Sequence, residues 1–199
     1  MEKQVIVSIS REFCSGGHII GESIAKTLGL GFCDRNILDE IAQRNNIRIE
    51  YLEKYDEKPR NLILSRRVGA FSNSIEDIIS EMQFEYLRDK ALNGESFVIV
   101  GRCADSVLRN YKCLIPIFVM GDEEAKIAEA CRRYNISREE AINKIRRHDR
   151  TRKQYHNRYS ERKWGDSRYY DMCVNSSKLG IEETATLLTE YIRQRIDKF

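Results

Sequence analysis

The segment at residues 5–31 constrains the fold most, because it combines a buried strand, a glycine turn and a helix in direct succession. Its first part, VIVSI, is a β-branched run typical of a strand that is buried on both faces of a parallel sheet. The polar turn at residues 11–17 ends in Ser-Gly-Gly. Apolar residues then recur at helical spacing up to Gly29, which predicts a helix with a glycine C-cap. Glycines let consecutive N–H groups converge and the helix N-terminus adds positive potential, so the segment predicts a loop suited to phosphate.

The loop departs from the full phosphate-binding pattern G-x-x-x-x-G-K-[ST]. With Gly16 as the second glycine, Arg11 takes the place of the first. Gly17 then stands where the lysine belongs, and His18 where the hydroxyl residue belongs. The pattern alone therefore fits a strand-to-helix turn that binds no ligand about as well as it fits a phosphate site.

Length and charge limit the classes of protein to be considered. The chain has 199 residues, 41% of them hydrophobic, which suffices for one core or for one core with a small appended lobe. We expect a single domain over residues 1–199. A formal charge of +3 is too small to imply nucleic-acid binding by the whole chain. No signal peptide precedes the first strand and no apolar run approaches the ~20 residues that cross a bilayer, so we expect a cytoplasmic protein with no membrane partner.

The cysteine pattern does not predict a metal site, because it lacks C-x-x-C pairs and histidines at zinc spacing. We expect reduced core residues at positions 14, 33, 103, 113, 131 and 173. Cys14 differs because it lies in the glycine loop, where a helix N-terminus would lower the pKa of its thiol. A packing role is still expected there over a reactive one.

The rest of the chain alternates strand and helix signals, which is typical of a parallel α/β sheet. Further strands are expected at residues 31–34, 96–100, 114–120 and 172–175, and helices at residues 75–92, 122–134, 137–155 and 180–196, with another beginning at residue 37. Residues 72–74 and the capping box at residues 137–140 mark two helix starts. Pro116 favours an edge or irregular start of its strand, and Lys58-Pro59 interrupts the helical pattern.

Three segments in the same order carry a resemblance to a known family: ISREFCSGG at residues 9–17, VIVGR at residues 98–102 and WGDSRYYDMCVNSSKLGIEE at residues 164–183. In these, the chain resembles the P-loop nucleoside monophosphate kinases, most closely the cytidylate kinase-like proteins. The resemblance implies a three-layer α/β fold with a parallel sheet flanked by helices. It further implies a helical monophosphate-binding lobe at residues 35–95 and a helical basic lid at residues 137–168.

The resemblance also implies ligands and site residues. ATP would bind the loop, with Mg²⁺ held through the phosphates and no protein metal ligand. The implied nucleotide-binding residues are Arg11, Cys14, Ser15, Gly16, Gly17, His18 and Ile19. Substrate-binding residues would be Asp34, Arg102, Asp105, Arg146, Asp149 and Lys153, and catalytic residues Arg102, Arg150 and Arg152. Asp105 is alternatively a purely structural partner for Arg102.

Several positions depart from the family pattern. Gly17 replaces the phosphate-binding lysine and Ile19 the magnesium-binding hydroxyl residue. In the lid, Arg152 replaces an acid that would read cytosine, and Tyr155 replaces a distal arginine. We therefore expect no special preference for cytidylate. Helical spacing places Arg146, Arg150 and Lys153 on one face of the lid helix and Arg152 on another. The alternative interpretation of these basic residues is a solvated surface that binds no phosphate.

These features support two main hypotheses. The first is a phosphotransferase that moves the γ-phosphoryl group of ATP to a nucleoside monophosphate or another small acceptor, with arginines in place of the lysine. The alternative is a catalytically impaired binding protein that senses a nucleotide or phosphometabolite, favoured by the missing lysine. A third, weaker hypothesis is nucleic-acid binding through the lid. The sequence leaves open whether the chain forms a homodimer.

Overall fold

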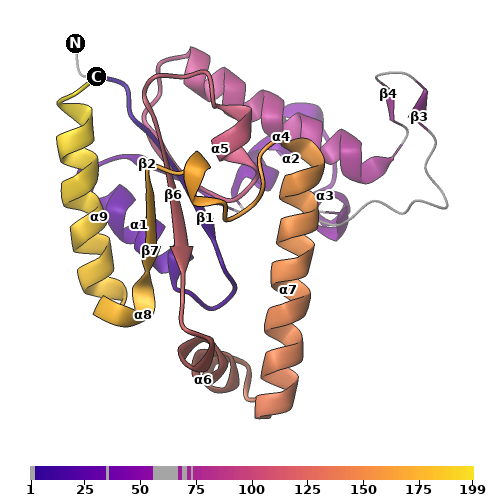
Figure 1. Cartoon of the computed structure of the whole chain (residues 1–199). Helices are drawn as coiled ribbons and strands as arrows, with labels where there is room; N and C mark the ends of the chain where they lie inside the picture. Colours follow the sequence, from indigo (N-terminus) through magenta and orange to yellow (C-terminus); the bar gives the residue numbers. More distant parts are fainter. Residues whose placement is uncertain (1–2, 35, 56–66, 69–70, 73) are drawn as a thin grey trace.

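A parallel sheet of five strands lies at the centre of the computed structural model, which describes residues 3–34, 36–55, 67–68, 71–72 and 74–199. The strands are β1 (Ile6–Arg11), β2 (Gly31–Cys33), β5 (Phe97–Val100), β6 (Leu114–Met120) and β7 (Met172–Asn175). They lie in the order β2-β5-β1-β6-β7, and each neighbouring pair is parallel (Figure 1). This arrangement confirms the predicted α/β class.

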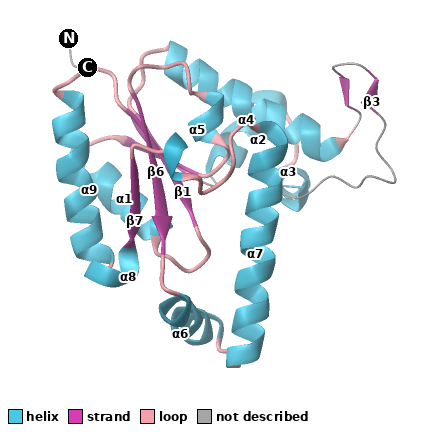
Figure 2. Ribbon diagram, viewed as in Figure 1, coloured by secondary structure: helices cyan, strands magenta, loops and turns pink. Residues whose placement is uncertain are grey.

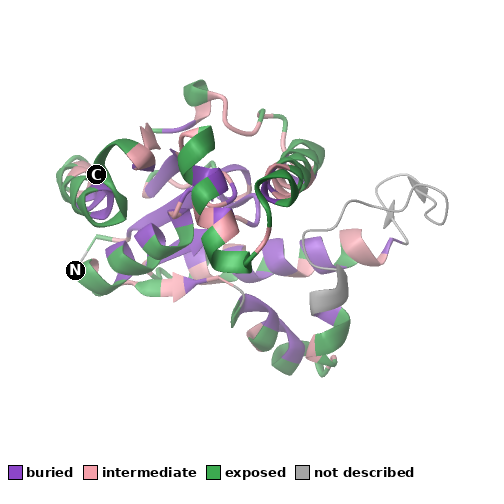
Figure 3. Cartoon of the chain, turned by 90° about the horizontal axis from the view of Figure 1, so that it is seen from below, coloured by how far each residue is buried: buried purple, intermediate pink, exposed green. Residues whose placement is uncertain are grey.

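Helices cover both faces of the sheet and give the predicted three layers (Figure 2). On one face lie α1 (Gly17–Leu28) and α9 (Ile181–Ile196), and on the other α2 (Asn36–Asn45), α4 (Ile75–Leu92) and α5 (Ala104–Val107). On the first face Ile20 and Ile24 pack in one cluster with Val7. On the second face Leu87 packs in another cluster with Phe97. The sheet is consequently buried between the two helical layers, as the β-branched strands predict (Figure 3).

Local signals set the helix ends largely as predicted. Gly29 ends α1 in the left-handed conformation at φ 65°, and the Ser74 side chain caps α4 by accepting a hydrogen bond from the amide of Asp77. Both halves of the capping box are present, since Ser137 and Glu140 exchange side-chain to backbone hydrogen bonds. That box opens α7 (Arg138–Tyr159), which runs past the predicted end at residue 155, while α6 (Glu123–Tyr134) precedes it.

The edge position predicted from Pro116 is wrong, because β6 lies between β1 and β7. The Pro116 carbonyl accepts a hydrogen bond from the amide of Asp171, so this residue faces β7. The β7 ladder begins only one residue later, where Ile117 pairs with Met172. The missing N–H of proline therefore falls just before that ladder, and an inner strand tolerates it.

The predicted helical lobe contains α2, α3 (Ile49–Tyr55) and α4, together with a two-stranded antiparallel pair of β3 (Arg67–Val68) and β4 (Phe71–Ser72) that the sequence did not indicate. The Lys58-Pro59 break and Asn73 lie outside the described residues. A 3₁₀ turn η1 (Ser167–Tyr169) and the short α8 (Ser176–Leu179) flank β7. Among the described helices, none has the length and apolar character that crossing a membrane requires.

Candidate active site at the carboxyl edge of the sheet

The loop between β1 and α1 has the backbone form of an anion site. Cys14 and Gly16 adopt left-handed conformations at φ 61° and 76°, on either side of Ser15. Within the described part of the chain, no protein group accepts a hydrogen bond from the amides of Gly16, Gly17, His18 or Ile19. The Ser15 amide is different, since it donates to the Glu12 carbonyl at 3.4 Å. The amides open to an anion are thus shifted one residue toward the helix.

Neighbouring elements hold this loop in place. The Ser15 hydroxyl lies 2.9 Å from the Glu12 carbonyl and 3.1 Å from that of Val119, while the Ser176 hydroxyl donates to the Ser15 carbonyl at 2.6 Å. A Cβ on Gly16 would stand 2.9 Å from the Ile181 side chain, so only glycine fits beneath the start of α9. The loop is therefore fixed between β6, α8 and α9 rather than free to reshape.

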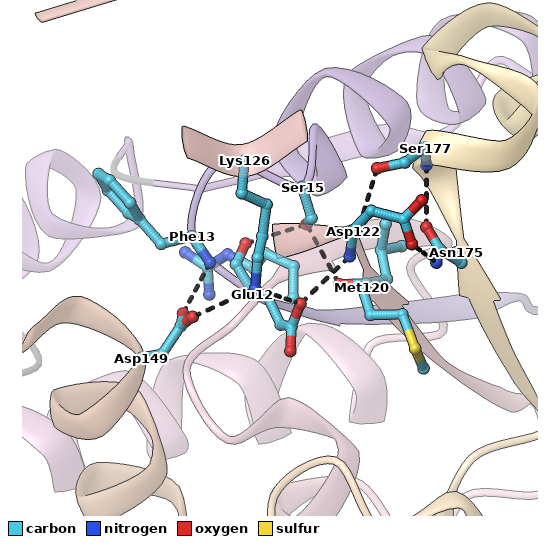
Figure 4. A network of polar contacts seen from close by, with 12 residues as sticks. Glu12, Phe13, Ser15, Met120, Asp122, Lys126, Asp149, Asn175 and Ser177 are labelled. Atoms are coloured by element: carbon cyan, nitrogen blue, oxygen red, sulfur yellow. Dashed lines mark hydrogen bonds and ion pairs between the residues drawn. The ribbon is translucent and has the colours of Figure 1, made fainter. Parts of the chain in front are cut away.

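A buried charged network joins the same loop to α6 and α7 (Figure 4). The Lys126 ammonium lies 2.8 Å from a Glu12 carboxylate oxygen, which also accepts from the Gly121 amide at 3.1 Å. Asp149 accepts from the Phe13 amide at 2.7 Å and lies 3.9 Å from Lys126. Burial raises the pKa of Asp149, and the Phe13 amide and the Lys126 charge oppose that rise. These contacts hold Asp149, which is predicted to bind substrate, against the backbone of the loop.

Three of the predicted arginines line one cleft at the end of β1. We call this the arginine cleft; it is lined by Ser10, Arg11, Gly101, Arg102, Cys103, Arg152, Tyr155, His156 and Trp164. It lies at the carboxyl ends of β1 and β5, beside α7, which is where open α/β sheets bind their ligands. The Arg152 guanidinium donates to the Arg11 carbonyl at 3.4 Å, and Arg102 is 3% exposed. The cleft is therefore strongly cationic.

The backbone that carries Arg102 is strained. Gly101, Arg102 and Cys103 follow one another in the left-handed region, at φ 82°, 56° and 54°. A non-glycine residue there costs about 1 to 2 kcal/mol. Two such residues immediately after β5 turn the chain sharply into α5, and they place Arg102 in the wall of the cleft.

Other predicted residues are not brought to the cleft. Arg146, Arg150 and Lys153 are exposed on α7, away from the face that carries Arg152. Asp34 directly follows β2, and its carboxylate lies 2.7 Å from His18 Nε2. Ile19 is 50% exposed at the start of α1.

Asp105 is 1% exposed and is not among the residues that line the cleft. Its carboxylate lies 2.8 Å from His156 Nε2 and accepts a longer hydrogen bond of 3.5 Å from the Ser10 hydroxyl. Sequence reasoning missed His156, Lys126 and Glu12. For His156 a signal existed, because it follows Arg152 by four residues and so shares its helix face.

Cys103, Asp105 and His156 also form a group whose potential donor atoms all lie within 4.8 Å of one another. Burial and the nearby Asp105 charge raise the pKa of the Cys103 thiol, which therefore stays protonated. The adjacent Arg102 adds positive charge. A protonated thiol beside a guanidinium is a poor cation site, so these residues do not fit a metal.

The pKa of the Cys14 thiol differs from the lowered value that its place in the loop predicts. Burial, and then the charge of Glu129, raise its pKa instead of lowering it. Its side chain packs with Phe13, Ile127 and Ile145 between the loop and helices α6 and α7. The packing role is thus supported by the structure.

Comparisons with known proteins agree with this geometry. A model of the cytidylate kinase-like family matches residues 6–178. A crystal structure of an uncharacterized protein from Eubacterium ventriosum is 31% identical and superposes with a TM-score of 0.75, covering 96% of this chain and 99% of that one. Shikimate kinase from Bacteroides thetaiotaomicron has a TM-score of 0.56 at 13% identity, with 95% and 98% of the two chains covered. Shikimate kinase from Aquifex aeolicus gives 0.52 at 14% identity, with 96% and 97% covered.

At such identities the likeness to shikimate kinases is one of fold alone. A comparison with curated proteins gave no match.

Proposed function

The chain belongs to the cytidylate kinase-like family, and from that premise we propose that it is a phosphotransferase acting from ATP on a small acceptor. The observation that carries the proposal is that the loop with the open amides follows β1 directly, and that the last two residues of β1, Ser10 and Arg11, line the arginine cleft. Phosphoryl transfer needs little covalent chemistry from the protein and depends on positioning and on neutralising charge. Both requirements are met by groups at one edge of the sheet, and we propose that a single domain over residues 1–199 provides them.

The loop fits a triphosphate in the absence of the lysine. Left-handed Cys14 and Gly16 and the four open amides that follow would hold the phosphates, supported by the positive end of α1. Bound ATP supplies the phosphoryl group that is transferred. Ile19 offers no oxygen ligand where the family has a hydroxyl, so Mg²⁺ would be held through the phosphates.

Arginines would take over the charge of the missing lysine. Arg11 and Arg102 flank the carboxyl end of the sheet, and Arg152 reaches the same cleft from α7. A guanidinium is permanently charged and offers planar pairs of donors, which suits the equatorial oxygens of a transferring phosphoryl group. Fixed donors of this kind lower the barrier because they need no reorganisation during the reaction.

A second candidate is a binding protein without turnover, favoured by Gly17 and Ile19 at the two catalytic loop positions. Calorimetry with ATP and Mg²⁺, combined with a transfer screen over nucleoside monophosphates and small alcohols, separates the two. The phosphotransferase is expected to bind ATP and to label at least one acceptor. ATP binding without transfer to any acceptor supports the sensor instead. Absence of ATP binding contradicts the phosphotransferase and leaves only a sensor of another phosphometabolite.

A further inference from the structure

A buried histidine in the arginine cleft has no role in the proposed function so far. His156 is 3% exposed, lines the cleft and lies on α7 one turn after Arg152. Its Nε2 lies 2.8 Å from Asp105 Oδ2, and both side chains are almost completely buried. Its other ring nitrogen, Nδ1, is buried and makes no hydrogen bond to any described residue.

The partners of Asp105 fix the tautomer of this histidine. The carboxylate accepts from the Ser10 hydroxyl at Oδ1 and faces the imidazole through Oδ2. A carboxylate that accepts at both oxygens requires the proton of the neutral imidazole to be on Nε2. Nδ1 then has a lone pair and no donor. Leaving a buried acceptor unpaired is costly, which points to a donor supplied by a ligand.

Resting on the proposed phosphotransferase, we propose that His156 is the general base for an alcohol acceptor that also carries an anionic group. The anionic group pairs with the cleft arginines, and the alcohol donates to His156 Nδ1. An attacking phosphate oxygen, as in a nucleoside monophosphate, is already ionised and has no proton to give. A buried histidine held as a base therefore favours a hydroxyl acceptor and a phosphate ester as product.

The proposed transfer involves only the acceptor, ATP, His156 and Asp105. The acceptor oxygen attacks the γ-phosphorus and forms a new O–P bond, while its proton moves to His156 Nδ1. The O–P bond to the departing diphosphate breaks, and its electron pair stays on that oxygen. Asp105 stabilises the resulting imidazolium, which returns its proton to solvent or to the leaving group. Asp105 is thus a positioning residue and His156 the residue that touches substrate.

Several charged or titratable groups lie around His156, on the elements packed against it. They are Arg11 from β1, Arg102 and Cys103 after β5, Asp105 from α5, Arg152, Tyr155 and Tyr159 from α7, and Tyr170 before β7. Burial raises the pKa of both Cys103 and Tyr170, so each stays neutral. Arginines stay charged throughout.

Two variants separate a base from a structural pair. His156→Gln keeps an amide donor where Nε2 stands, so it preserves the hydrogen bond to Asp105, but it has no basic nitrogen. Asp105→Asn reverses the polarity of that hydrogen bond and moves the proton to Nδ1. Arg147→Gln, an exposed change on the same helix, is the matched control. Transfer from ATP is measured with glycerol 3-phosphate, glycerate and CMP, and ³¹P NMR assigns the product as ester or anhydride.

We expect an ester product from glycerol 3-phosphate or from glycerate. Whichever of the two reacts shows whether the cleft recognises a phosphate or a carboxylate as the anionic group. His156→Gln should lower kcat at least about 100-fold, with the ATP dissociation constant unchanged within about twofold. Undiminished kcat in this variant overturns the proposal, as does CMP converted to an anhydride as the preferred reaction. The latter result leaves the phosphotransferase intact, whereas ATP binding with no transfer to any acceptor overturns both.

A readout independent of activity uses the small number of histidines, three in the chain. In ¹⁵N-histidine spectra His156 should show a protonated Nε2 and an unprotonated Nδ1, and Asp105→Asn should invert this pattern. His18 and His148 provide reference signals. A His156 protonated at Nδ1 in the unmodified protein overturns the proposal.

Discussion

A Cβ atom on Gly17 would stand only 2.6 Å from the Cβ of Arg11, a separation that real side chains do not adopt. The position of the family's loop lysine is thus closed to any side chain. We expect Gly17→Ala to lower the free energy of unfolding by about 1 to 3 kcal/mol through overpacking, and Gly17→Lys to bring no gain in ATP affinity. In the double variant that combines Arg11→Gly with Gly17→Ala, removing the Arg11 side chain should restore the free energy of unfolding that Gly17→Ala alone loses.

Thermal and urea denaturation measure these effects. Gly31→Ala is the control, because its nearest contact would be an ordinary 3.5 Å. Equal losses at both glycines would contradict the steric explanation.

The open amide of His18 is expected to bind a phosphate. His18→Pro removes that N–H in the first turn of α1, where proline is tolerated. Losing one charge-assisted hydrogen bond should weaken ATP binding by about 1.5 to 3 kcal/mol, or roughly 10- to 150-fold. His18→Ala isolates the side chain, and Glu182→Pro repeats the backbone change at the second position of α9. Calorimetry showing equal affinity for His18→Pro and His18→Ala would argue against a backbone phosphate site.

Arg102 and Arg152 should act as one binding unit, since both line the cleft. Replacing either with alanine is expected to weaken ligand binding by about 1 to 3 kcal/mol with little change in Tm. Arg147→Ala, on the exposed surface of α7, should leave affinity unchanged. If Arg102→Ala lowers Tm while affinity per folded molecule is retained, its role is structural.

Cytidylate should have no privileged affinity. Arg152 replaces the acid that would read cytosine, and Tyr155 replaces the aligned arginine. Affinities for CMP, UMP, AMP and GMP measured by calorimetry are expected to fall within about tenfold, or 1.4 kcal/mol, of one another. A larger preference for CMP would show that another group reads the base.

The Cys14 thiol should react slowly. Since burial raises the pKa of this thiol, its thiolate fraction at pH 8 is below that of a free thiol. Its alkylation by iodoacetamide, followed by peptide mass spectrometry, should lag behind that of free cysteine and accelerate only at higher pH. A rate above that of free cysteine at pH 8 would restore the reactive interpretation.

Local patterns were sufficient to predict most of the fold. The Gly29 cap, the capping box before α7 and the β-branched strands each depend on residues close in the chain, so spacing reveals them. The edge position for Pro116 was wrong because strand order depends on contacts between distant segments. Proline has no backbone N–H to donate. Whether it is tolerated therefore depends on whether the neighbouring strand needs a donor at that position.

The site was predictable only in part for the same reason. Helical spacing correctly separated Arg152 from Arg146, Arg150 and Lys153, but it could not say which face meets the cleft. His156 and Asp105 are 51 residues apart in the chain, and Lys126 and Glu12 are 114 apart. Polar pairs at such separations leave no periodic signal in one sequence.

The hydrogen bond from the Phe13 amide to Asp149 has a mechanical consequence, because Asp149 lies near the middle of α7. The helix is also held on both sides of this point, by the ion pair of Arg138 with Glu124 near its start and by that of Arg158 with Asp77 near its end. The half before Asp149 presents Arg146 to solvent, and the half after it carries Arg152 and His156. A displacement of the loop at Phe13 is therefore transmitted to the helix that carries Arg152 and His156, and both ion pairs oppose it.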